Sequence, residues 1–247
     1  MRVALVTGAT KNIGYAIASA LARGGTAVAV NGRDAAAVQD AVRRLEAEGA
    51  TAAPAVGSIA GEEGVQAVVD AAVQRLGPVD VLVNNAGLRA HGPLATMALE
   101  DWSAVLDTVL TGSFLTTRAV LPGMCERGWG RVVNIAGVSG QKGAADRAPV
   151  VAAKSGLIGL TKATAHEAAP SGVTANAISP GLIDTQRSQS LGDAAVARAH
   201  YAHMAAQVPL QRQGSPAEVA SLCAFLCSED AGFITGQVYG INGGALM

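Results

Sequence analysis

The chain has 247 residues, half of them apolar, and a formal net charge of -1 at pH 7. This length suits one sizeable α/β domain with a full core, and the balanced charge argues against nucleic-acid binding. The three cysteines, Cys125, Cys223 and Cys227, show no metal-ligand pattern with histidine, so we expect neither a disulfide framework nor a metal site. We also expect a cytoplasmic protein without membrane contact, because the first residues enter a strand directly and no apolar run is long enough to span a bilayer.

Short apolar runs alternate with segments of helical periodicity along the chain. The runs predict strands at 3–6, 27–30, 52–56, 79–83, 131–135 and 174–178, and a last strand with a glycine turn within 236–244. The segments between them predict helices at 13–23, from 35 to about 49, at 62–76, at 99–127 with an interruption near 122–123, at 150–168 and from 216. This alternation predicts a Rossmann-like, doubly wound parallel sheet covered on both faces, in a single domain that spans 1–247.

One segment, about 185–209, departs from this rhythm because it is locally polar and has no strand pattern. An insertion near the carboxyl ends of the strands is typical of a substrate lid. A solvated connecting helix is the alternative interpretation.

The first predicted strand leads into a glycine turn, 7–14, before the first helix. Backbone N–H groups and a helix N-terminus at such a turn can hold a pyrophosphate. Asn12 stands where a glycine would be usual, and asparagine tolerates left-handed backbone angles better than other residues with a side chain.

Together with this turn, three further motifs carry a resemblance: Asn-Asn-Ala-Gly at 84–87, Ser-Pro-Gly-Leu-Ile-Asp-Thr at 179–185, and an ending that runs from Pro-Ala-Glu-Val-Ala at 216–220 through Thr-Gly-Gln at 235–237 to Gly-Gly at 243–244. In this order and spacing, the chain resembles a compact short-chain dehydrogenase/reductase, similar to bacterial 3-oxoacyl-carrier-protein reductases. The resemblance covers essentially the whole chain. It implies a dinucleotide cofactor, a small-molecule substrate, and a homodimer or homotetramer in which helices starting near 99 and 150 pack between subunits.

The resemblance also indicates which dinucleotide binds. Members that prefer NAD(H) usually have an acid at the end of the second strand, where this chain has Gly32 followed by Arg33, with Lys11 in the glycine turn. Two cations suit a 2'-phosphate, so NADP(H) is favoured over NAD(H). Ser58 stands where the family commonly has an adenine-binding aspartate. The cofactor-binding residues implied by the resemblance are Gly8, Thr10, Lys11, Asn12, Ile13, Gly14, Arg33, Ser58, Asn85, Ala86, Gly87, Lys154, Pro180, Gly181, Ile183 and Thr185.

Family chemistry depends on a Tyr-x-x-x-Lys pair, a serine about thirteen residues before the tyrosine, and an asparagine on the preceding long helix. Lys154 is in place, but the tyrosine, serine and asparagine positions hold Val150, Gly137 and Val109. Lys154 either still binds the ribose or, if partly desolvated, acts as a base or an imine-forming nucleophile.

Other side chains are candidates to replace the missing groups. Ser139 can stand in for the serine if the loop is re-routed, His91 borders the substrate in the family, and Tyr201 is the one tyrosine that can reach the site from the lid. Further candidates for the proton donor are Lys142, Asp146, His200 and His203.

We therefore expect an NADPH-dependent reductase of a small carbonyl, imine or enone substrate that lacks the usual Ser/Tyr proton-transfer pair. The alternatives are a non-redox enzyme on the same scaffold, such as a cyclase, isomerase or dehydratase, and a catalytically inactive binding or partner subunit.

Overall fold

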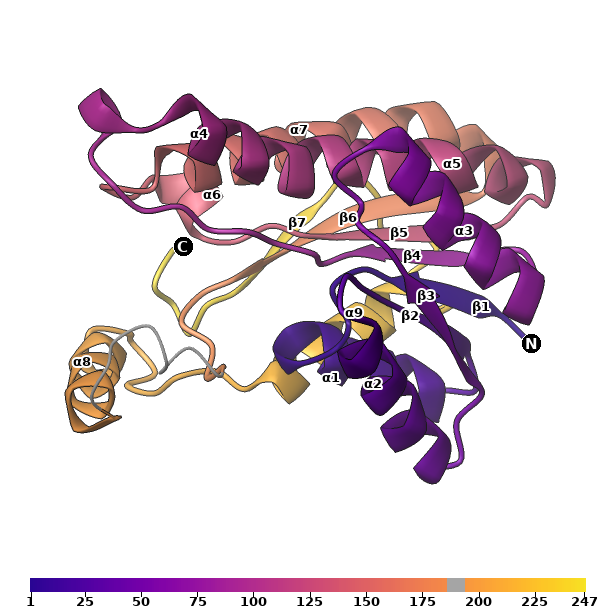
Figure 1. Cartoon of the computed structure of the whole chain (residues 1–247), viewed down its shortest axis with the longest axis horizontal. Helices are drawn as coiled ribbons and strands as arrows, with labels where there is room; N and C mark the ends of the chain where they lie inside the picture. Colours follow the sequence, from indigo (N-terminus) through magenta and orange to yellow (C-terminus); the bar gives the residue numbers. More distant parts are fainter. Residues whose placement is uncertain (186–193) are drawn as a thin grey trace.

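The sheet has seven parallel strands in the order β3-β2-β1-β4-β5-β6-β7 (Figure 1). The computed structural model describes residues 1–185 and 194–247. Its strands are β1 (Val3–Val6), β2 (Ala27–Gly32), β3 (Ala52–Val56), β4 (Val81–Asn84), β5 (Gly130–Ile135), β6 (Val173–Pro180) and β7 (Val238–Ile241). The chain runs outward from β1 to one edge, then returns to β4 and continues to the other edge, which is the predicted doubly wound arrangement. The prediction of a single Rossmann-like α/β domain is confirmed.

Helices cover both faces of this sheet and bury its central strands on both sides (Figure 1). One face carries α1 (Asn12–Arg23), α2 (Ala35–Ala47) and α9 (Pro216–Leu226), and the other carries α3 (Glu62–Leu76), α5 (Gly112–Glu126) and α7 (Ala148–Ala168). Each face has its own apolar core, and Cys223 and Cys227 belong to the first one. The remaining helical elements are the short turns Leu94–Thr96 and Ala169–Ser171, α4 (Leu99–Leu106), the π segment Asp107–Thr111, α6 (Ser139–Lys142) and α8 (Ala194–Ala206).

The long helix predicted at 99–127 is interrupted, but not at the predicted place. Pro122 lies inside α5 without ending it, whereas the backbone widens into the π segment, where the Gly112 N–H donates to the carbonyl of Asp107, five residues back. Hydroxyl groups on the next turn compensate for this widening, because Ser113 Oγ donates to the Val109 carbonyl at 2.7 Å. The proline prediction was therefore wrong, and single-turn π segments often lie at functional sites.

By length and composition alone, the helical stretch Leu99–Glu126 could cross a membrane, contrary to the expectation that no apolar run is long enough. Its 28 residues have a mean hydropathy of 1.2 in the most apolar window, of which 44% is buried. In the fold, α5 packs on α3, β4 and β5, and α4 packs on α7. The stretch is apolar because it covers the sheet.

Candidate active site

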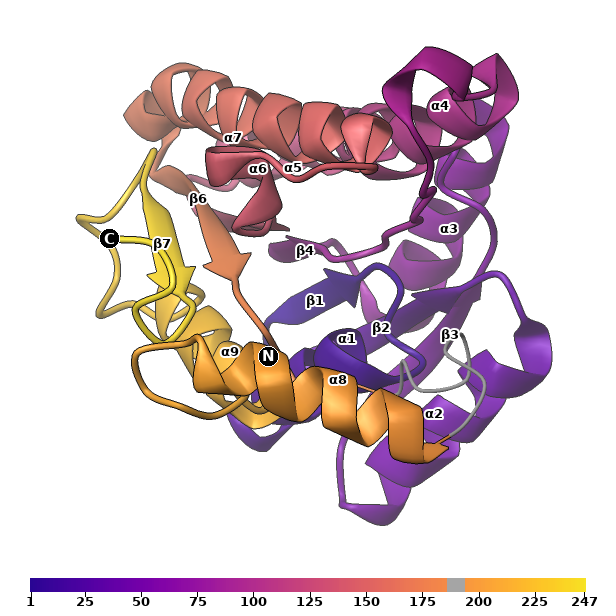
Figure 2. The same ribbon diagram turned by 90° about the vertical axis from the view of Figure 1, so that its left-hand side faces the viewer.

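The loops that leave the carboxyl ends of β1, β4, β5 and β6 meet at one edge of the sheet, as expected for parallel strands. Figure 2 faces this edge, with α6 and the start of α7 above the strand ends and α8 across the lower front. This edge gathers most of the residues singled out in the sequence. Of the segment predicted as a lid, 185–209, the structure describes α8 (Ala194–Ala206) and its flanking residues, whereas residues 186–193 lie outside the described residues.

The first turn at this edge has the backbone shape that a phosphate cradle needs. Asn12 is left-handed, with φ 53°, in agreement with the tolerance expected of asparagine at this position. A Cβ atom on Gly14 would lie 2.2 Å from the Gly8 carbonyl oxygen and 2.5 Å from Asn85 Nδ2, so the turn packs too closely for a side chain there. Gly8 has φ 60°, and a Cβ atom on it would approach the backbone of Ala86 to 2.9 Å.

Buried polar side chains hold this turn in place. Thr7 Oγ1 accepts hydrogen bonds from the backbone N–H groups of Asn85 (2.9 Å) and Ala86 (3.0 Å). Asn85 Nδ2 in turn donates to the carbonyls of Thr7 and Gly8, each at 2.9 Å. The sequence interpretation missed Thr7, although a threonine at the end of a fully buried apolar strand was a signal for it.

The N-terminus of α1 is open toward the edge of the sheet. Its cap residue, Lys11, makes no side-chain capping bond, and the N–H groups of Ile13 and Gly14 donate to no acceptor in residues 1–185 or 194–247. The helix α9, by contrast, has a complete capping box between Ser215 and Glu218. Free N–H groups at a helix N-terminus favour an anion.

Two cations flank the adenosine side of this turn. Lys11 and Arg33 are exposed, and neither forms an ion pair with any described residue. A Cβ atom on Gly32 would lie 2.7 Å from Thr10 Cγ2 and 2.9 Å from Val38 Cγ2, so the position where the resemblance implies an acid in NAD(H)-binding members accepts a side chain only if these two side chains shift. Ser58 is exposed, and its hydroxyl accepts a hydrogen bond from the N–H of Ala60 at 3.3 Å.

The loop after β6 supplies the other half of the site. Ile183 is buried and bridges to Gly214, and a Cβ atom on Gly181 would lie 2.8 Å from the Cα atom of Asn242. Thr185 Oγ1 is buried and has no hydrogen-bond partner within the described chain. Since buried hydroxyl groups are normally paired, this atom is suited to a polar group of a bound molecule.

Lys154 lies on α7 and reaches back to the sheet. Its Nζ donates a hydrogen bond to the carbonyl of Ile135, the last residue of β5. Burial is the main cause that lowers the pKa of Lys154 to about 8, and the positive charge of Arg89 contributes in the same direction. A Cβ atom on Gly140 would come within 2.8 Å of the Lys154 backbone, so α6 packs directly on this turn of α7.

An apolar cluster occupies the positions at which the resemblance implies the asparagine and the tyrosine. It consists of Val105, Val109, Val150 and Ala153, and we call it the valine cluster. Val109 is 1% exposed and Val150 is 8% exposed. Leu88, Ala90, Leu106 and Leu110 pack against it. The cluster joins the π segment to α7 and is separate from both cores on the sheet.

Ser139 lies close to the place where a side chain on Gly137 would begin. A Cβ atom on Gly137 would be 3.9 Å from Ser139 Oγ and 3.9 Å from the Pro180 carbonyl. Gly137 itself has φ 155°, which few residues other than glycine adopt. The hydroxyl of Ser139 is thus near the implied serine position, although it comes from a residue two places later.

The remaining proton-donor candidates lie in three different places. His91 is exposed in the segment after β4, and Tyr201 lies on α8, where its ring contacts that of His200 edge to face at 5.5 Å. Tyr201 is near enough to Arg89 to raise the pKa of that guanidinium. His203, on the same helix as Tyr201, is exposed, and its ring nitrogen lies 3.0 Å from the side-chain amide of Gln207. Lys142 and Asp146 are exposed residues at the end of α6 and in the loop before α7.

Two arginines at this edge, Arg89 and Arg147, were not among the residues singled out in the sequence. Burial lowers the pKa of Arg89, and the charge of Arg147 acts in the same direction. Burial also lowers the pKa of His91, with Arg147 and Arg89 as the next causes, while Asp146 opposes them. A neutral imidazole is therefore favoured at His91.

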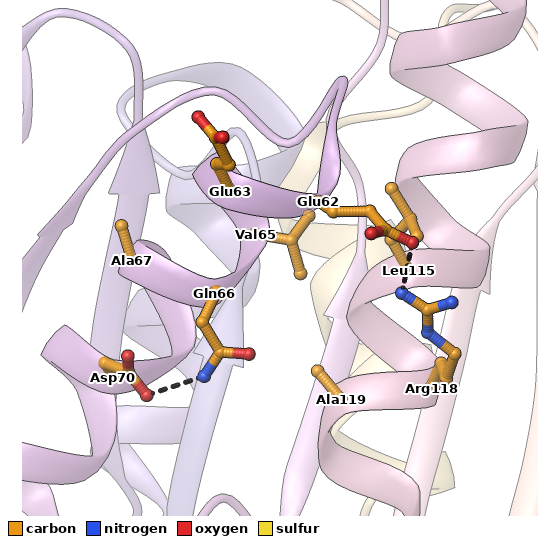
Figure 3. Close-up of a pocket in the computed structure, with 9 residues that line it drawn as sticks. All are labelled: Glu62, Glu63, Val65, Gln66, Ala67, Asp70, Leu115, Arg118 and Ala119. Carbon is orange, nitrogen blue, oxygen red and sulfur yellow. Dashed lines mark hydrogen bonds and ion pairs between the residues drawn. The ribbon is translucent and has the colours of Figure 1, made fainter.

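A separate hollow of about 590 Å³ lies between α3 and α5 (Figure 3). Glu62 and Arg118 form an ion pair of 2.7 Å across it, and the wall also includes Leu115 and Ala119. None of the candidate residues described above lines this hollow. Its open, charged wall differs from the apolar pocket with a few converging polar groups that is typical of an enzyme site.

Comparisons with known proteins cover nearly the whole chain. Residues 8–245 match a family model described as enoyl-(acyl carrier protein) reductase. The chain is 40% identical over 246 residues to the 3-oxoacyl-[acyl-carrier-protein] reductase FabG of Vibrio cholerae, covering 100% of this chain and 98% of the relative. It is 38% identical to the acetoacetyl-CoA reductase of Cupriavidus necator, covering 100% and 98%. Among solved structures, a variant of the actinorhodin polyketide ketoreductase with NADPH superposes with a TM-score of 0.93 at 38% identity, covering 99% of this chain and 97% of that one.

Proposed function

Because the chain belongs to the short-chain dehydrogenase/reductase family, we propose that it is an NADP(H)-dependent reductase of a small carbonyl, imine or enone substrate that works without the family's serine–tyrosine pair. The observation that carries this proposal is the contrast between the two halves of the site. The nucleotide turn has open N–H groups, and Lys11 and Arg33 form no ion pair within residues 1–185 and 194–247, whereas the implied tyrosine and asparagine positions are filled by the valine cluster.

The residues present fit the cofactor. The N-terminus of α1 holds the pyrophosphate, Arg33 and Lys11 hold the 2'-phosphate, and Thr185 Oγ1 gains the partner that it lacks within the described chain. Lys154 binds the ribose hydroxyls beside Ile135. When bound, NADPH supplies the hydride. The protein positions the acceptor carbon and provides the proton.

The valine cluster leaves this site without the proton donor that the family resemblance implies. A positioned general acid contributes about 10²- to 10⁴-fold to the rate, and Val150 and Val109 provide none. Substrates that need little help from an acid, such as a conjugated enone or an iminium, are therefore favoured. Among the groups present, Lys154 with its lowered pKa, Tyr201 and Ser139 stand at the same edge of the sheet and can donate a proton.

A binding titration tests the cofactor half. We expect NADPH to bind more tightly than NADH, and Arg33→Ala to weaken NADPH binding about 10- to 100-fold with little effect on NADH, because the phosphate contact is charge-assisted. Arg43→Ala is the matched control, since Arg43 is exposed on the same side but pairs with Asp40 within α2. If neither dinucleotide binds more tightly than about 1 mM, the reductase proposal is wrong.

One observation favours a second candidate function, a non-redox enzyme that uses Lys154 as a nucleophile. An amine whose pKa is lowered to about 8 is more available for imine formation than an ordinary lysine. Borohydride reduction in the presence of a carbonyl compound would attach that compound to Lys154. Recovery of an unmodified Lys154 peptide by mass spectrometry would rule this function out.

We also propose that the protein forms a homodimer or homotetramer through α4, α5 and α7. Phe114 on α5 is 43% exposed and Leu99 at the start of α4 is 72% exposed, so this helical surface presents large apolar side chains to solvent. This interface is tested by comparing the molar mass of Phe114→Asp with that of the unaltered chain by light scattering, and a lower mass for the variant is expected.

A further inference from the structure

Three cationic residues, Arg89, Arg147 and Lys154, lie on segments that border the valine cluster. Leu88 and Ala90 pack against the cluster, and Arg89 lies between them in the chain with an exposed side chain. The N–H of Gly92 donates to the carbonyl of Asp146 at 3.0 Å, so the segment after β4 is tied to the loop before α7. The next residue, Arg147, caps α7, and Val150 and Lys154 follow at spacings of three and four, on one face of the helix.

The charges of these groups act on one another. Arg89 lowers the pKa of Lys154, and Arg147 lowers that of Arg89, so the charge of Arg89 is close enough to act on Lys154 and to be acted on by Arg147. Two described groups oppose them: Asp146 raises the pKa of His91, and Tyr201 raises that of Arg89. Neither Arg89 nor Arg147 forms an ion pair with a described residue, whereas Arg118, Arg127 and Arg131 do.

Unpaired like charges at one site are unfavourable unless a ligand brings the opposite charge. Arg89 is exposed overall, but burial of part of its side chain is the main cause that lowers its pKa, so the guanidinium has lost some water without gaining a carboxylate. The planar fork of arginine matches a carboxylate through two parallel hydrogen bonds. The floor formed by the valine cluster suits a short carbon skeleton next to such a group.

We propose that Arg89, assisted by Arg147, binds a carboxylate of the substrate, so that the substrate class is a small carbonyl, imine or enone compound that bears a carboxylate. This inference rests on the proposed reductase function for the identity of the reacting group. The carboxylate anchors the substrate on the Arg89 side of the valine cluster, and the reacting carbon lies toward Lys154.

Matched acids and methyl esters test this inference directly. The probes are acetoacetate and 4-oxopentanoate, each with its methyl ester, and their binding to the NADPH-saturated protein is measured by calorimetry. We expect each acid to bind at least about 10-fold more tightly than its ester, because an arginine–carboxylate pair is a charge-assisted interaction. Arg89→Met should abolish this preference, while Arg89→Lys keeps part of it.

The control variant is Arg118→Met, which removes an arginine of α5 that pairs with Glu62 away from the site. It should keep the full preference for the acids. Two results would overturn the inference: esters that bind the unaltered protein as tightly as the acids, or an Arg89→Met variant that weakens acid and ester equally, which indicates a structural role. Arg89→Lys serves for this comparison if Arg89→Met does not fold.

The same experiment separates this inference from the proposed function. If the acids bind through Arg89 but NADPH is neither bound nor oxidised, the reductase proposal fails and the carboxylate site stands. If NADPH is oxidised with neutral carbonyl compounds and the acids show no advantage, the carboxylate site fails and the reductase proposal stands.

Discussion

Replacing Val150 by tyrosine tests whether the frame around Lys154 can still support proton transfer. Val150 is 8% exposed and packs with Val105, Val109 and Ala153, so the larger ring must displace its neighbours. Overpacking of this kind costs about 1 to 3 kcal/mol of stability. The spacing of four from Lys154 places the new hydroxyl on the same helix face as the ammonium, which lowers the pKa of the phenol.

The assay is NADPH oxidation with an uncharged ketone, and the control is Val150→Phe, which adds the same ring without the hydroxyl. We expect kcat/KM of Val150→Tyr to exceed that of Val150→Phe by about 10²- to 10⁴-fold, the usual contribution of a positioned general acid. Equal activity of the two variants would refute the reasoning, because the ring would then have no productive contact with the substrate. Ser139→Ala in the Val150→Tyr background should remove part of the gain if Ser139 Oγ stands in for a hydroxyl at Gly137.

Three further predictions concern stability. A pKa of about 8 for Lys154 in the folded chain, against 10.5 unfolded, means that the unfolded chain binds more protons between these values; urea unfolding should therefore show stability rising by up to about 3 kcal/mol across this pH range relative to Lys154→Met. Asn12→Ala should lower the melting temperature by about 2 to 4 °C and Asn12→Gly much less, because φ is 53°. Asn134→Ala should cost about 1 to 3 kcal/mol in urea unfolding, since it breaks buried bonds to Asn84 (2.9 Å) and Thr161 (2.8 Å), whereas Thr164→Ala, on α7 with Thr161, should cost less.

The strands and the sheet topology were predictable because β1, β4, β5 and β6 are short apolar runs that are buried throughout, and the edge strands β3 and β7 are also short runs at the expected spacing. The interruption of the long helix was not. Pro122 is a strong local signal, but tertiary packing keeps its turn helical. The π segment, by contrast, depends on hydroxyl–carbonyl bonds such as that from Ser113, and a serine inside a helical pattern gives no warning of them.

The nucleotide turn was predictable because its chemistry lies within eight consecutive residues. The proximity of Arg89 and Arg147 was not predictable, because they are far apart in sequence. Their segments come together in the fold, where the Gly92 N–H donates to the Asp146 carbonyl. A weak signal was present: between Gly87 and Gly92, apolar Leu88 and Ala90 alternate with Arg89 and His91, as in an extended segment with one buried side.

Valine at 109 and valine at 150 each favour an apolar side chain at the other position, because the two belong to one buried cluster. An asparagine at 109 facing Val150 would leave a buried amide with no partner in the valine cluster, which costs about 1 to 3 kcal/mol. A tyrosine at 150 facing Val109 would have to direct its hydroxyl toward Lys154 or leave it unpaired. With valine at both positions, every side chain of the cluster is apolar and no polar group is stranded. This apolar contact packs the π segment against α7, and Lys154 follows Val150 by four residues on the same helix.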